Sequence, residues 1–119
     1  MAGLPPAITT AVDRDRKTLV FSFRECMSVP LEDIQDSIYS LQLDGILPPK
    51  TVEIANIDNR ICITFRRPPR IPSHGRNKRY KEWCSRMELI VRTMIIGIQS
   101  GVKKNGISDH VYASIGAAA

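Results

Sequence analysis

The spacing of the apolar residues changes along the chain, and this change most restricts how the chain can fold. Over residues 18–23 apolar side chains alternate with others, which predicts a strand with one buried face. From Leu31 the apolar positions recur at steps of three and four, which predicts a helix packed on a sheet. Pro30 suits the first turn of that helix, and Gly45 suits its end. The apolar positions of this strand and helix are Leu19, Phe21, Phe23, Leu31, Ile34, Ile38 and Leu41.

Two further strands are expected after this helix, joined by a short turn. Residues 50–55 alternate again, with Val52 and Ile54 on one face, and residues 60–65 alternate in the same way. Residues 56–59 are Asn-Ile-Asp-Asn, a composition that is typical of a tight turn between antiparallel strands. This part of the chain therefore predicts the order strand, helix, strand, strand.

A long apolar stripe follows in the C-terminal half. Its residues recur at helical spacing, which predicts one helix over residues 77–100 with Gly101 as its cap. Alternatively, a short helix over residues 78–87 precedes a fourth strand over residues 89–98, because apolar runs rich in Ile and Val suit either structure. The stripe consists of Trp83, Met87, Ile90, Val91, Met94, Ile95 and Ile98.

The length of the chain fits one small domain. A chain of 119 residues, of which 43% are hydrophobic, can bury its own core. We expect an α+β domain over residues 18–104, with a small antiparallel sheet packed by two helices, the second long and amphipathic. Residues 1–17 are expected to be a flexible lead-in, since Pro5 and Pro6 resist regular structure. Residues 105–119 are expected to be a weakly structured tail.

Positive charge is concentrated in residues 66–81, here called the basic segment. The whole chain has a net charge of +5, whereas this segment alone contains seven Lys or Arg and no Asp or Glu. Such a concentration is typical of a surface that binds a polyanion. Arginine predominates, which favours bidentate contacts with phosphate. The predicted nucleic-acid contacts are Arg66, Arg67, Arg70, Arg76, Lys78, Arg79 and Lys81, with Tyr80 as a base-stacking side chain.

The residues able to perform chemistry form no recognisable catalytic or metal-binding motif. Cys26, Cys62 and Cys84 form no CxxC pair, and together with His74 and His110 they match no zinc-ligand spacing. Neither histidine has a nucleophile or carboxylate at a catalytic spacing. We therefore expect a protein that is not an enzyme and has no cofactor, metal or small-molecule substrate. Reduced cysteines fit an intracellular location, cytoplasmic or nuclear.

The order of elements resembles that of the RNA-recognition-motif family if residues 89–98 form the fourth strand. The ferredoxin-like plan of that family would then extend over residues 18–98. In the family, aromatic residues of the third strand stack on bases. In the corresponding strand here, residues 60–65, only Phe65 matches, and it lies on the core side. The resemblance therefore implies RNA binding through the basic segment in place of a stacking sheet.

Residues 31–67 also resemble the N-terminal region of Gag-like proteins from retroelements. The shared pattern is a helix, a Gly-Ile-x-Pro connector, a hairpin that ends in Ile-Thr-Phe, and a basic run. This resemblance implies a viral-type or retroelement-derived structural or accessory protein. The apolar face of the C-terminal helix, which Leu89 and Ile96 widen, separately suggests self-association, for example as a homodimer. Such a protein would use the basic segment on an anionic membrane or an acidic protein. The helix residues expected to form its self-association seam are Met87, Ile90, Val91, Met94 and Ile98.

The function that we expect first is non-catalytic binding of RNA or another single-stranded nucleic acid. Its affinity would come mainly from phosphate contacts and would depend only weakly on base sequence. The assembly protein is the alternative. Both use the basic segment as the binding surface, and they differ in its partner and in whether the apolar stripe of the C-terminal helix is needed for self-association.

Overall fold

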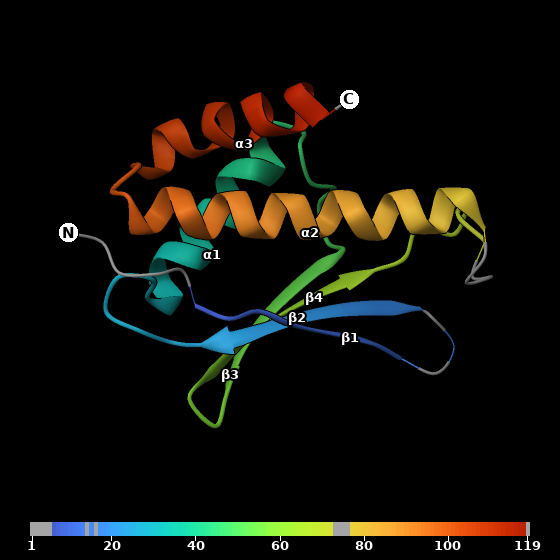
Figure 1. Cartoon of the computed structure of the whole chain (residues 1–119), viewed down its shortest axis with the longest axis horizontal. Helices are drawn as coiled ribbons and strands as arrows, with labels where there is room; N and C mark the ends of the chain where they lie inside the picture. The colour runs from blue at the N-terminus through green and yellow to red at the C-terminus, as the bar shows by residue number, and fades with distance from the viewer. Residues whose placement is uncertain (1–5, 14, 16, 73–76, 119) are drawn as a thin grey trace.

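The computed structural model describes residues 6–13, 15, 17–72 and 77–118 of the chain. Within these residues, four strands and three helices form a small α+β fold (Figure 1). The elements are β1 (Thr9–Val12), β2 (Thr18–Arg24), α1 (Leu31–Leu43), β3 (Val52–Ile57), β4 (Arg60–Arg66), α2 (Lys78–Gln99) and α3 (Lys104–Ala118). The predicted fold class, a small antiparallel sheet packed by helices, is confirmed.

The sheet has the strand order β1-β2-β4-β3, and all its neighbouring strands are antiparallel. Its centre is the β2–β4 pair, in which Phe21 is opposite Ile63 and Phe23 is opposite Ile61. These side chains share one face and are fully buried, as the alternating pattern predicts. At the β3–β4 turn, Asp58 has a φ of 52° and the following asparagine a φ of 64°. Asp and Asn tolerate this left-handed backbone, which a two-residue hairpin of the favoured type requires.

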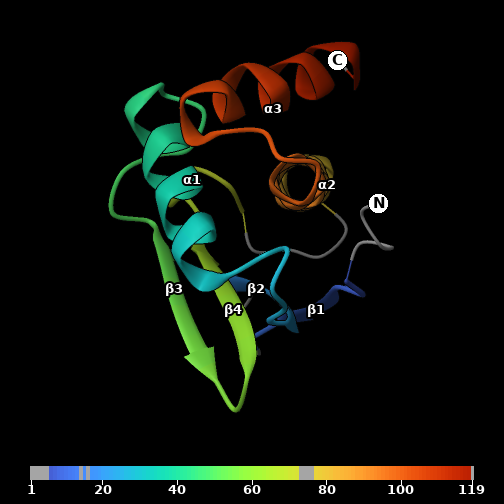
Figure 2. The same cartoon turned by 90° about the vertical axis from the view of Figure 1, so that its left-hand side faces the viewer.

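The helices lie on one side of the sheet in two layers. Figure 2 shows α1 and α2 next to the sheet, with α3 crossing outside them. The buried side chains of α1, which include Ile34, Ile38 and Leu41, join those of β2 and β4 in one core. Among the helices of the described residues, none has a stretch long and apolar enough to cross a membrane.

Helix α2 runs without interruption through the segment that could also have been a strand. Residues 89–98 are helical, so the alternative with a fourth strand there is wrong. The ferredoxin-like order that depended on this strand is therefore not the order of this fold. The helical conformation is favoured because it places the apolar side chains of this segment on one face, where they are buried between the sheet and α3.

Both ends of the described chain are more ordered than the sequence predicts. Thr9–Val12, expected within a flexible lead-in, is strand β1 and pairs with β2. All side chains of β1 are exposed, so the strand is held in place by its backbone hydrogen bonds with β2. The prediction of a weakly structured tail is also wrong, because residues 105–118 lie in α3. This helix buries Ile107 and Val111 in the common core, so the domain extends beyond residues 18–104.

Candidate nucleic-acid interface

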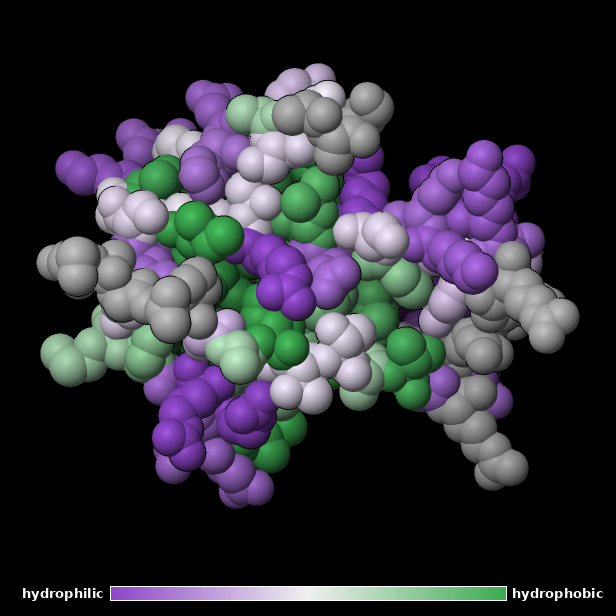
Figure 3. Space-filling view, in the orientation of Figure 1, coloured by the Kyte–Doolittle hydropathy of each residue, from purple (hydrophilic) through white to green (hydrophobic). Residues whose placement is uncertain are grey.

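The two flanks of the basic segment meet at one end of the molecule. Arg66 ends β4, while Lys78, Arg79 and Lys81 lie in the first turn of α2. Figure 1 shows that β4 ends and α2 begins on the same side of the fold, and Figure 3 shows hydrophilic residues gathered there. Arg76 lies outside the described residues.

The described cations of the segment differ in how free their side chains are. Arg66, Arg70, Lys78, Arg79 and Lys81 are exposed. Arg67 is half-buried, and its guanidinium donates a hydrogen bond to the carbonyl of Ile71. The backbone N–H of Arg67 also donates to the carbonyl of Lys17, with an N···O distance of 2.7 Å. Arg67 therefore helps to fix the path of the chain after β4, and the five exposed cations form the accessible charge.

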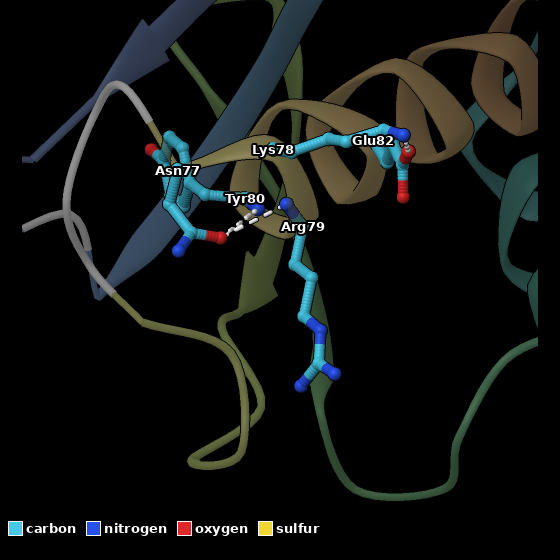
Figure 4. Close-up of polar contacts among 5 residues, drawn as sticks. All are labelled: Asn77, Lys78, Arg79, Tyr80 and Glu82. Atoms are coloured by element: carbon cyan, nitrogen blue, oxygen red, sulfur yellow. Dashed lines mark hydrogen bonds and ion pairs between the residues drawn. The ribbon is translucent and has the colours of Figure 1, made fainter.

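Helix α2 begins with a side-chain cap followed by cations. The Asn77 side-chain oxygen accepts hydrogen bonds from the backbone N–H groups of Arg79, at 2.9 Å, and Tyr80, at 3.3 Å (Figure 4). The Nζ atom of Lys78 is 3.8 Å from the Oε1 atom of Glu82, but both side chains are largely exposed, so this ion pair is weak. Figure 4 shows the side chain of Arg79 extending away from the helix. The cap thus holds the helix start in place while the cations remain available.

The charge at the start of α2 opposes the helix dipole. The N-terminal end of a helix carries partial positive charge and is stabilised by acidic residues. Helix α1 follows this rule with Glu32 and Asp33 in its first turn. The first turn of α2 contains no acidic residue and holds Lys78, Arg79 and Lys81. The helix dipole therefore disfavours the charges at the start of α2.

Tyr80 does not have the role that its cationic neighbours suggested. Its side chain is only 6% exposed, and its ring centre is 6.1 Å from that of Trp83. The prediction of a base-stacking Tyr80 is therefore wrong, because the residue shares the buried face of α2 with Trp83 and Met87. Burial raises the pKa of the neighbouring Cys84 thiol, against the smaller opposite effect of its hydrogen bond with Tyr80.

The predicted self-association seam is part of the core. Its residues, each at most 8% exposed, are Met87, Ile90, Val91, Met94 and Ile98. They contribute to one continuous cluster with the sheet and the other helices. The prediction of a self-association seam made of these side chains is therefore wrong. The apolar stripe that suggested the seam is needed to hold α2 on the sheet.

A groove of about 940 Å³ lies beside the exposed cations. Its walls come from the α1–β3 connection, the chain after β4 and the first turns of α2. The lining combines apolar and charged side chains, and includes Ile46, Pro48, Pro68, Arg70, Ile71, Arg79, Glu82, Trp83, Arg86 and Met87. Mixed lining of this kind suits a ligand with both an apolar and an anionic part.

Arg86 is a member of this surface that the sequence pattern did not single out. It lies outside the basic segment, seven positions after Arg79. Residues separated by seven positions return to the same face of a helix. The signal was therefore present as helical spacing, although it was absent from the run of consecutive cations.

Comparison of the chain with protein-family models, curated proteins and solved structures finds no match. Within the part of the chain that the structure describes, no group of three or more His, Cys, Asp or Glu side chains is placed to hold a metal ion. The geometry and charge of the surface around the α2 start are thus the observations from which a function is inferred.

Proposed function

We propose that this protein is a non-catalytic module that binds nucleic acid, with single-stranded RNA as the favoured ligand. The observation that supports this most directly is the first turn of α2, where Lys78, Arg79 and Lys81 oppose the helix dipole. Residues that reduce local stability are expected at functional sites. Phosphate is the anion that a cluster of Arg and Lys side chains binds in nucleic acids.

The exposed cations provide contacts from two directions. Lys78, Arg79 and Lys81 reach the ligand from the helix, and Arg70 reaches it from the chain after β4. Arg66 lies on the open face of the sheet, beside Lys50 and Glu53, where it can contact only a strand that continues around that edge. Each contact releases counterions from the nucleic acid, which makes the affinity salt-dependent and largely independent of sequence. With roughly four or five phosphates contacted on a single strand, the slope of log K against log salt should be about −3.

The first test is a salt titration of three fluorescent ligands: single-stranded RNA, duplex DNA and anionic vesicles. We expect single-stranded RNA to bind most tightly, with a slope of about −3. Affinity that does not change with salt would contradict the proposal. Preferential binding to the vesicles would instead indicate a membrane-binding protein.

A triple variant, Lys78→Gln with Arg79→Gln and Lys81→Gln, tests whether the start of α2 binds the phosphates. Neutralising three cations should weaken binding and reduce the slope by about 0.7 for each phosphate that is no longer bound. Arg92→Gln is the matched control, since Arg92 lies on the same helix and pairs with Glu88 at 3.1 Å. The proposal fails if the control weakens binding as much as the triple variant.

A further inference from the structure

The groove beside α2 offers an apolar lining and an excess of positive charge in one place. We propose that it binds one nucleotide of the strand, with the base against the apolar wall and the phosphates on either side of that base on Arg70, Arg79 and Arg86. This inference rests on the proposed function and adds to it a defined site for an unpaired base. A base inside a duplex could not enter, so the groove would select single strands.

The groove is large enough to receive a base against its apolar wall. The members of this wall are Ile46, Pro48, Pro68, Ile71, Trp83 and Met87. The volume of about 940 Å³ lies within the range of roughly 300–1,000 Å³ that is usual for ligand pockets. Trp83 is only 9% exposed, so it contributes to the wall without presenting a full stacking surface. Simple phosphate binding would leave this apolar lining without a partner.

The charged residues of the groove complement a phosphate. Arg70, Arg79 and Arg86 outnumber the one acidic residue, Glu82, and Glu82 lies 3.8 Å from Lys78. In Figure 4 the Arg79 side chain extends away from the axis of α2, consistent with its place in the groove lining. Guanidinium groups bind phosphate with paired hydrogen bonds and also stack on aromatic rings. A nucleotide satisfies both properties, which favours it over a purely acidic ligand.

Helix α2 presents the groove residues in a regular arrangement. Arg79, Trp83 and Arg86 are spaced by four and then three residues, so they lie along one stripe of the helix. The apolar residue of this stripe is thus placed between two arginines. The same spacing would place the phosphates on either side of a bound base near one arginine each.

Trp83 makes the groove directly observable, because it is the only tryptophan in the chain. The full chain is titrated with a short single-stranded RNA, with an abasic ribose-phosphate strand of equal length, and with an acidic peptide. We expect RNA to change the Trp83 emission. The abasic strand should bind about tenfold more weakly, because it has no base to pack against the apolar wall, and should leave the emission unchanged.

Arg86→Gln is the variant that separates the groove from the basic segment. Its exposed side chain can be replaced without disturbing the core, and we expect RNA affinity to fall about fivefold to tenfold. The difference between RNA and abasic strand should shrink in parallel. Arg92→Gln, the exposed arginine paired with Glu88, should leave both affinities within about twofold of the parent.

Three outcomes would overturn this inference. Equal affinity for RNA and the abasic strand, with a steep salt dependence and an unchanged Trp83 emission, would leave the proposed function standing and remove the base site. Absence of nucleic-acid binding at low salt would remove both. A change of Trp83 emission with the acidic peptide and none with RNA would assign the groove to a protein ligand.

Discussion

At the scale of single residues, the start of α2 combines a good cap with an unfavourable charge. Asn77 satisfies two backbone N–H groups, as N-cap residues commonly do. The cations that follow interact unfavourably with the helix dipole, each by about 0.3–1 kcal/mol at low ionic strength. The cap therefore offsets a cost that the cations introduce, and the two effects can be separated by mutation.

Arg79→Glu should make the protein more stable and should weaken its binding to RNA. The new carboxylate would lie in the first turn, where it interacts favourably with the dipole, and we expect a gain of about 0.5–1 kcal/mol in the free energy of unfolding. RNA affinity should fall at least tenfold, because a phosphate contact is replaced by repulsion. Urea denaturation and the RNA titration at the same low salt concentration measure the two effects.

Lys103→Glu is the control for this charge reversal. It changes the net charge by the same amount at the other end of α2, which is about 33 Å long for its 22 residues. At that distance, which exceeds the Debye length of about 10 Å at 0.1 M salt, its effect on RNA binding should be small. A loss of stability in Arg79→Glu would show that the dipole argument is wrong.

The sequence predicts the charge of the candidate site better than its geometry. The exposed side chains of Arg70 and Arg79 could be anticipated, since Pro-rich loops and helix starts lie at the surface. The cationic neighbours of Tyr80 suggest an exposed ring, whereas its position three residues before Trp83 puts it on the buried stripe of the helix. Arg86 falls outside the run of cations, and only helical spacing relates it to Arg79. Both cases concern the face of a helix, which depends on where the core lies.

At the scale of elements, the sequence predicts those whose apolar side chains point to the core in a regular pattern. The expected helix at Leu31 and the expected strand over residues 60–65 appear as α1 and β4 with nearly the same bounds. Strand β1 has no buried side chain, so it depends on pairing with β2 and gave no periodic signal. Helix α3 did have a signal, since Ile107, Val111 and Ile115 recur at every fourth position.

Gly97→Ala tests how α3 is held against α2. A Cβ at this position would lie 2.7 Å from the Cδ2 atom of His110 and 2.9 Å from the Cδ1 atom of Ile107. The crowding should cost about 1–3 kcal/mol, which exceeds the gain of about 1 kcal/mol from replacing glycine inside a helix. We expect a net loss of about 1 kcal/mol in the free energy of unfolding, measured by urea denaturation.

Gly106→Ala is the matched substitution on α3. Its added methyl group would lie 3.8 Å from a side-chain carbon of Val102, an ordinary contact, so only the helix propensity changes. The expected result is a gain of up to about 1 kcal/mol. If both variants were stabilised equally, the close approach of α2 and α3 at Gly97 would not be a feature of the protein in solution.

At the scale of the whole molecule, α2 connects the candidate interface to the core. Its first turn carries three of the five exposed cations, while the remainder packs between the sheet and α3 (Figure 2). Because these three residues stand on a helix anchored along most of its length, the backbone positions from which their side chains extend are fixed. Pre-organisation of this kind reduces the ordering cost of association. The groove shares this support, since Trp83 and Met87 belong to both its wall and the core.

The central position of α2 predicts that one substitution in it should destabilise the entire fold. Ile90 is 1% exposed, and Ile90→Ala should lower the free energy of unfolding by about 2–5 kcal/mol. Ile96 on the same helix is 45% exposed, so Ile96→Ala should change it by no more than about 0.5 kcal/mol. Far-UV circular dichroism and Trp83 fluorescence should report coincident urea transitions in each variant, because the sheet and helices share one core. If Ile90→Ala instead left stability intact and changed the oligomeric state, the apolar stripe would be a contact between copies of the chain, and the packing of α2 on the sheet would be wrong.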